Sequence, residues 1–149
     1  MNIIELVKQV LQEFPKINIV CNDIHVDFTD DTATNYGLSP TGDKLIKENI
    51  LGNKVRQHAF VLYAVYQSQS DYDRMANSGT LLELQYWLEK NGKNREIFTI
   101  VDNEEVTGTL TKLTCANGML YSIPNGNLND GVLYQLQITA DYKIESEEL

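Results

Sequence analysis

Cysteine and basic residues are scarce in this chain of 149 residues. Its two cysteines, Cys21 and Cys115, lack the C-x-x-C spacing of metal and redox sites, so we expect free thiols that pack as small apolar side chains. No apolar run approaches the roughly 20 residues that a membrane-spanning helix needs. The opening sequence MNIIELVKQVLQEF alternates apolar with charged residues, unlike a secretion signal, so we expect a cytoplasmic protein.

Positive charge is outnumbered. Twelve Lys and Arg residues face 21 acids, for a net charge of −9. This balance argues against a general DNA-binding surface, because phosphate binding depends on Lys and Arg. The length fits one domain over residues 1–149 that buries roughly 70% of its unfolded surface, with a frayed acidic tail at 145–149.

Residue patterns for catalysis or metal binding are also lacking. His25 and His58 are isolated, with no second ligand at metal-binding spacing. We expect His58 to mark a sheet edge or to contact a neighbouring subunit. Four acids invite a calcium interpretation, but the EF-hand spacing is absent and a solvated acidic loop is favoured; they are Asp23, Asp27, Asp30 and Asp31.

Other catalytic signatures fail as well. Gly37 and Gly42 flank Ser39-Pro40-Thr41 without forming a phosphate-binding motif, and no G-x-S-x-G elbow occurs. A spatial pair of catalytic carboxylates stays open, although nothing selects any two of the acids. We therefore predict no catalytic, cofactor-binding or metal-ligating residue, and a protein that is not an enzyme. Several aromatic residues indicate core packing or an oligomer interface more than base stacking: Tyr63, Tyr66, Tyr72, Tyr86 and Trp87.

Apolar spacing predicts the N-terminal elements. Asn2 with Glu5 indicates a helix start, and the helix is expected to end at Pro15 after burying Ile3, Val7, Val10, Leu11 and Phe14. Two short strands are predicted at Ile17–Val20 and Ile24–Phe28. The stretch Thr29–Gly42 is expected to be mostly loop, in which Tyr36 and Leu38 could occupy a short irregular strand.

The middle of the chain predicts a hairpin and a helix. Asp43–Leu51 and Lys54–Tyr66 are expected to pair around a two-residue Gly52-Asn53 turn, with Ile50 opposite Val55 and Ile46 opposite Ala59. The first strand is charged and expected to be exposed, whereas the second is apolar on both faces. A helix is expected from a capping box at Ser70 and Asp73 to Asn91-Gly92, with a kink or break at Ser78-Gly79 and an apolar stripe of Leu81, Leu84, Trp87 and Leu88.

The C-terminal third predicts strands. Val106–Cys115 and Met119–Ile123 are expected to form a second hairpin around Asn117-Gly118, a type I′ turn signal. In Val132–Tyr142 apolar residues alternate over the whole run, which predicts a strand with one buried face. The fold class expected is α+β, a single domain with a mostly antiparallel twisted sheet and two to three helices packed mainly on one face.

Two stretches carry a family resemblance: SPTGDKLIKENILGNKVRQHAFVLYAVY from Ser39 to Tyr66, and NSGTLLELQYWLEK from Asn77 to Lys90. They resemble the minor capsid or tail-terminator family of siphophages and prophages of Gram-positive bacteria. The resemblance is strongest over Thr41–Lys90 and does not extend to the loop Thr29–Leu38 or to the acidic C-terminus.

This resemblance implies a virion protein of the head-tail junction, assembled in the host cytoplasm. It would cap the tail tube as a homo-oligomer, a hexameric ring, end tube polymerisation and contact the tail-tube protein and the head-completion or connector protein. DNA would pass through the lumen without specific binding, and an acidic lumen would repel it. One of two sets on the second hairpin strand could then meet a neighbouring subunit: Phe60, Leu62, Ala64 and Tyr66, or Val61, Tyr63 and Val65.

A function of another class stays open beside this one. It is a small cytoplasmic ligand-binding or enzymatic α+β domain whose pocket lies between the helices and the sheet.

Overall fold

Helices and strands follow one another along the computed structural model, which describes residues 1–15, 24–26, 35–66, 71–122 and 132–145. None of the helices in these ranges is both long and apolar enough to cross a membrane. The elements are α1 Ile3–Gln12, β1 Ile24–Val26, β2 Asn35–Glu48, β3 Lys54–Tyr66, α3 Asp71–Asn91, β4 Arg95–Val101, β5 Glu104–Ser122 and β6 Val132–Ile144.

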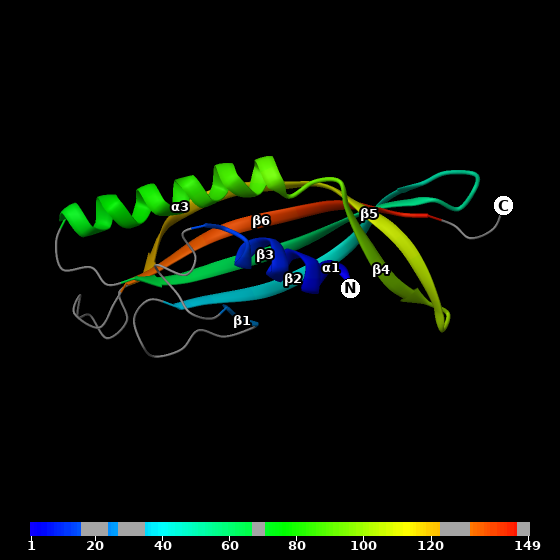
Figure 1. The fold of residues 1–149 in the computed structure, drawn as a ribbon, viewed down its shortest axis with the longest axis horizontal. Helices are drawn as coiled ribbons and strands as arrows, with labels where there is room; N and C mark the ends of the chain where they lie inside the picture. Colours follow the sequence, from blue (N-terminus) through cyan, green and yellow to red (C-terminus); the bar gives the residue numbers. More distant parts are fainter. Residues whose placement is uncertain (16–23, 27–34, 67–70, 123–131, 146–149) are drawn as a thin grey trace.

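One six-stranded sheet organises the fold, in the order β1-β2-β3-β6-β5-β4. Its strands β2 to β6 pair antiparallel, and the short β1 lies parallel to β2. Both helices lie over the same side of this long, twisted sheet (Figure 1). The predicted class, a single-domain α+β fold with a mostly antiparallel sheet, is confirmed.

The first helix forms as its sequence predicts. Asn2 is the N-cap, and its Oδ1 accepts a hydrogen bond from the Glu5 N–H at 2.9 Å. The helix is tied to the edge of the sheet at both ends: the Phe98 N–H donates to the Met1 carbonyl at 2.8 Å, and Arg95 Nη1 lies 2.5 Å from Glu13 Oε2. The N-terminal segment is thereby joined to β4.

Helix α3 is continuous from Asp71 to Asn91, so the kink or break expected at Ser78-Gly79 does not occur. Gly79 faces open space, and a helix tolerates an exposed glycine at a cost of about 1 kcal/mol. The helix ends where predicted, with the Gly92 N–H donating to the Leu88 carbonyl at 2.7 Å. Ser70, the expected cap, lies outside the described residues.

The core fills the space between the helices and one face of the sheet. The predicted alternation of β6 is confirmed, because every second side chain from Tyr134 to Tyr142 is buried. Burial of each large apolar side chain contributes on the order of 1.5–3 kcal/mol. The core includes Leu6, Val7, Val10 and Leu11 of α1, Phe14 just after it, Leu81, Leu84 and Leu88 of α3, Leu38, Phe60, Leu62 and Ala64 of β2 and β3, and Ile97, Leu110, Leu113, Tyr134, Leu136, Ile138, Ala140 and Tyr142 of the last three strands.

The first hairpin differs from its prediction in extent and register. β2 begins at Asn35, inside the stretch that was expected to be mostly loop. The strand forms there because its backbone pairs with β3, and this pairing cannot be predicted from the local sequence. Bulges between Pro40 and Gly42 and between Leu45 and Lys47 shift the register. The predicted partners of Val55 and Ala59 are therefore wrong; their partners are Lys47 and Gly42.

The turn of this hairpin is longer than the two residues predicted. Residues 49–53 connect the strands, and the Asn49 side chain organises them by accepting hydrogen bonds from the Leu51 and Asn53 N–H groups, each at 3.0 Å. Gly52 still has the positive φ that its position suggested, 86°. The side chain of Asn49 thus replaces part of the backbone ladder.

The second predicted hairpin is wrong. Asn117-Gly118 lies within the continuous strand β5, at a bulge between Ala116 and Met119, and both flanks pair with β6. The turn lies earlier, at Asp102-Asn103, where φ values of 51° and 66° suit a type I′ turn between β4 and β5. The return strand expected at Met119–Ile123 is therefore the last part of β5 as far as Ser122.

The early predicted strands are only partly within the described chain. Ile24–Val26 forms β1, whereas Ile17–Val20 and the end of the second predicted strand lie outside the described residues.

Candidate interaction surface

The two histidines lie on different strands, His25 on β1 and His58 on β3. His58 was expected at a sheet edge or a subunit contact, but it lies on the central strand β3 with 7% of its surface exposed. Its ring stacks on Phe60 at 4.4 Å, and Nδ1 lies 3.0 Å from the Ala59 carbonyl oxygen. His58 is thus a core residue, and His25 pairs through β1 with Gly37.

The described residues give little support for a metal site or for a reactive thiol. They contain no group of three or more His, Cys, Asp or Glu that could hold a metal ion. The acids expected in a solvated loop, together with Cys21, lie outside these residues: Asp23, Asp27, Asp30 and Asp31. Cys115 is free and half-buried, and burial, helped by the charge of Glu89, raises the pKa of its thiol to about 12.

The aromatic residues divide between core and surface. Trp87 packs edge-on against Phe14 with ring centroids 5.6 Å apart, which joins α3 to the segment just after α1. Tyr86, its neighbour, is 61% exposed. Tyr63 is half-buried on β3, and the side chains of Tyr66 and Tyr72 lie outside the described residues.

The two faces of β3 have different environments. Phe60, Leu62 and Ala64 are buried beneath the helices, so this set cannot meet a neighbouring subunit. Val61 and Tyr63 are half-buried on the opposite side of the sheet, which no helix of the described chain covers and which we call the open face. Of the two candidate sets, only the second has described side chains, those of Val61 and Tyr63, that are partly accessible.

The end of the β2–β3 hairpin projects beyond both helices (Figure 1). We call residues 43–56 the arm. Its tip is apolar and exposed: Ile50 is fully exposed and Leu51 is 68% exposed, and Leu45 and Ile46 are about half-exposed. Exposed apolar side chains grouped on a projecting element are typical of a docking surface. The exposure predicted for the first hairpin strand is confirmed.

Three polar side chains brace the base of the arm. Arg56 Nε donates to Asp43 Oδ1 at 2.6 Å, and the Tyr142 hydroxyl donates to Asp43 Oδ2. The hydrogen bond with Asp43 raises the pKa of Arg56, partly offset by desolvation. Burial, followed by the bond to Asp43, raises the pKa of Tyr142. Asp43 thus links β2 to both β3 and β6.

A second projection, the hairpin of β4 and β5, lies at the same end of the molecule (Figure 1). Residues 96–105 contain four acids and no Lys or Arg, and we call them the acidic hairpin. The acids Glu96, Asp102, Glu104 and Glu105 are all exposed, as are Ile100 at 75% and Val101 at 39%. No strand was predicted from the sequence at β4 and the acidic hairpin was therefore missed, although Asp102-Asn103 after the apolar run Ile97–Val101 is a turn signal.

A cleft of 560 Å³ separates the arm from the acidic hairpin. Lys54 and Arg56 line it on the arm side, and Asp102 and Glu104 line it on the other. Tyr142 also borders the cleft. No ion pair between described residues crosses it, so the two charged walls remain separate within one copy.

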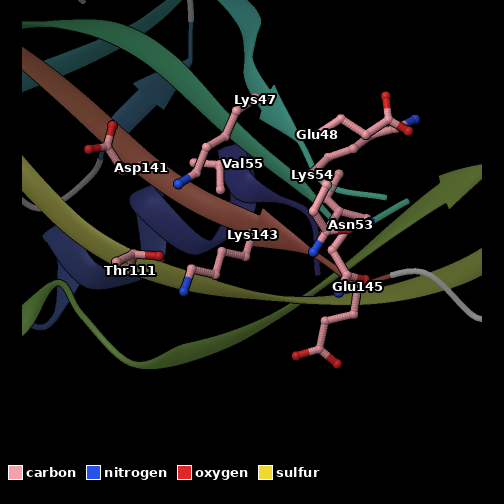
Figure 2. A pocket seen from close by; sticks show the side chains of 11 residues that line it. Lys47, Glu48, Asn53, Lys54, Val55, Thr111, Asp141, Lys143 and Glu145 are labelled. Atoms are coloured by element: carbon pink, nitrogen blue, oxygen red, sulfur yellow. Dashed lines mark hydrogen bonds between the residues drawn. The ribbon is translucent and has the colours of Figure 1, made fainter. Parts of the chain in front are cut away.

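Another hollow, of 540 Å³, lies beside the arm where β2, β3, β5 and β6 run together (Figure 2). Figure 2 shows Lys47 and Lys143 extending their ammonium groups to the same side, with Glu48 and Glu145 directed away from them. Asp141 accepts a hydrogen bond from Gln57 Nε2 at 2.9 Å and lies 3.7 Å from Lys112 Nζ. The lining of this hollow contains both lysines and carboxylates, so the charge of the hollow favours neither anions nor cations.

Comparison with known proteins adds no relative: no protein-family model matches the chain, and no curated protein matches it.

Proposed function

We propose that this protein is a structural component of a phage virion that caps the tail tube as an oligomeric ring. It ends tube polymerisation and joins the tail to head-completion proteins. The observation that carries the proposal is the arm, whose exposed apolar tip projects beyond both helices. A tip of this kind is stabilised when a partner removes Ile50 and Leu51 from water.

The resemblance in sequence supports the same function. Its strongest part, Thr41–Lys90, contains the arm, the central strand β3 and the helix α3 that covers it. This stretch therefore combines a projecting contact element with the core that holds it in place. The net charge of −9 suits a ring through which DNA passes, because an acidic lumen repels the phosphate backbone.

The other function, a small ligand-binding or enzymatic domain, requires a pocket between helices and sheet. In the described chain that space is occupied by core side chains such as Leu84, Leu88 and Phe60, each at most 1% exposed. The cleft and the hollow described above lie instead at the end of the sheet. No specific observation favours this second function.

Tube capping tests the proposal directly. Tail-tube protein from the same phage or prophage is polymerised with and without the purified chain, and tubes are examined by negative-stain microscopy. We expect tubes of limited length with a ring at one end, and a native mass of six 16.9-kDa chains for the ring. Tubes that keep growing with bare ends, together with a strict monomer that binds a small ligand saturably, would establish the other function.

A matched pair of variants connects this assay to the arm. Ile50→Ser with Leu51→Ser removes the apolar tip, and we expect it to abolish capping without changing the thermal midpoint, because both side chains are exposed. Leu82→Ser on α3, where Leu82 is 47% exposed, is the control and should cap normally. Equal capping by all three proteins would exclude the arm from this function.

A larger change separates assembly from folding. Removal of residues 43–55 deletes most of the arm but leaves the core of β3 from Phe60 onward. We expect this variant to lose ring formation while it keeps a cooperative unfolding transition.

A further inference from the structure

Among the described residues, the sheet has an unpaired strand edge on each side. Within the described residues β1 pairs only with Tyr36–Leu38, so the rest of β2, including its part of the arm, has β3 as its single neighbour. Of the described strands, β5 alone pairs with β4, which lies at the other edge. Phe98, within the acidic hairpin, donates its N–H to the Met1 carbonyl, and the rest of the acidic hairpin beyond Phe98 continues this second edge. Unpaired strand edges are templates for association with another chain.

The two edges differ in charge. The arm carries four basic residues against two acids, a net charge of +2, and Asp43 is already paired with Arg56. The acidic hairpin carries a net charge of −4. Because the whole chain is at −9, two copies repel each other at long range, whereas the basic arm of one copy attracts the acidic hairpin of the other.

Apolar side chains accompany these charges on both projections. Ile50 and Leu51 lead the arm, and Ile100 and Val101 lie on the acidic hairpin, all of them exposed. An apolar centre with a charged rim is the usual composition of a protein interface. The two projections therefore both expose apolar side chains and carry charges of opposite sign.

We propose that the arm of one copy docks on the acidic hairpin of a second copy. The contact is head-to-tail, since it joins two different surfaces, and every copy in it still offers a free arm or a free hairpin to the next. Such contacts close into rings when the rotation between copies allows it. This inference rests on the self-association contained in the proposed function but not on tube capping.

A mixing experiment tests the head-to-tail contact. One variant, Ile50→Ser with Leu51→Ser, loses the arm surface but keeps the hairpin; the other, Ile100→Ser with Val101→Ser, loses the hairpin but keeps the arm. Sedimentation velocity and native mass should show that wild type self-associates and that each variant alone is monomeric, with association weakened roughly tenfold or more. An equimolar mixture should form a 1:1 dimer and nothing larger, because only one complete contact remains.

Charge exchange provides a second measurement. Lys47→Glu and Glu104→Lys should each weaken self-association, and the two changes combined in one chain should restore part of it. Lys90→Glu, at an exposed position on α3, is the control for reversing one charge and should associate like wild type. Higher ionic strength should weaken the wild-type contact, since exposed charges are screened.

Several outcomes overturn the proposal. They are a wild-type chain that stays monomeric, variants that associate as strongly as wild type, or a mixture that gives no dimer. A homodimer formed by either variant alone also overturns the proposal, because it indicates that two copies of the same surface contact each other. The mixture contains no tail-tube protein, so these results are independent of the capping assay.

Discussion

Arg56 Nε lies 2.6 Å from Asp43 Oδ1, and this contact joins β3 to β2 at the base of the arm. The other carboxylate oxygen of Asp43 accepts a hydrogen bond from the Tyr142 hydroxyl, so three strands meet at one carboxylate. A partly exposed ion pair contributes only about 0.2–1 kcal/mol to stability. Together, this ion pair and the hydrogen bond from Tyr142 hold the arm in a defined direction relative to β6.

Tyr142 makes the stability of this junction dependent on pH. An unfolded tyrosine loses its proton near pH 10, whereas the raised pKa of Tyr142 keeps the folded phenol protonated to a higher pH. Above about pH 10 the unfolded state therefore binds fewer protons than the folded state, and stability falls as pH rises. Its contribution is fully present below pH 10 and is lost as the pH passes through the folded-state pKa.

Urea unfolding at about pH 8 and about pH 11 measures this effect. We expect Tyr142→Phe to lose less stability between the two pH values than wild type does. Tyr86→Phe, at an exposed tyrosine of α3, controls for the removal of one phenol. Identical pH dependence in wild type and Tyr142→Phe would contradict the assignment.

Two glycines should respond oppositely to alanine. Gly79→Ala in α3 should stabilise the protein by about 0.5–1 kcal/mol, because alanine favours the helix and a new Cβ meets nothing within 4 Å. Gly108→Ala in β5 should destabilise it severely, because the Cβ would lie 2.2 Å from the Lys143 backbone oxygen. Thermal unfolding of both variants checks the pair, and a Gly108→Ala protein as stable as wild type would refute this packing.

Neighbouring positions on β6 should differ according to the face that they occupy. Ile138 is fully buried beneath the helices, and Ile138→Asp would place an unpaired carboxylate in the core, so we expect loss of soluble expression. Gln137→Asp, on the exposed side of the strand, should express and unfold cooperatively. Soluble yield and urea unfolding distinguish the two results, and a stable Ile138→Asp variant would contradict the orientation of β6.

Cys115 should react slowly while the protein is folded. In a Cys21→Ser background it is the single thiol, and burial raises its pKa to about 12. The thiolate fraction at pH 8 is then roughly 10³-fold lower than for an unfolded cysteine, and alkylation by iodoacetamide should slow by a similar factor. The urea-unfolded chain supplies the reference rate, and equal rates in both states would place this thiol at the surface.

Local sequence was sufficient to predict the elements that are determined by residue spacing within one segment. The Asn2 cap, the apolar stripe of α3 and the alternation from Tyr134 to Tyr142 depend on spacing within one segment, and each is present in the structure. The α+β class followed from these patterns. An exposed first strand in the arm could also be predicted, because its charged residues are incompatible with two-sided burial.

Pairing between strands determined the turn position and the strand register, which local sequence patterns could not predict. Asn117-Gly118 and Asp102-Asn103 are both turn signals, and all residues but Gly118 have positive φ. Only the second is a hairpin turn, because β6 offers a ladder to both flanks of the first and keeps β5 extended. The register of β2 likewise depends on two bulges, and only the first of them, at Pro40 and Gly42, has residues that signal a bulge.

The candidate interaction surface shows the same division. From sequence alone, the arm could be predicted as a charged hairpin with isoleucine and leucine near its turn, and the chain as acidic. Only the tertiary structure brought Tyr142 to Asp43 across 99 residues and placed the arm and the acidic hairpin on different edges of one sheet. Strand order sets these positions, and strand order results from long-range pairing and burial, which no single segment encodes.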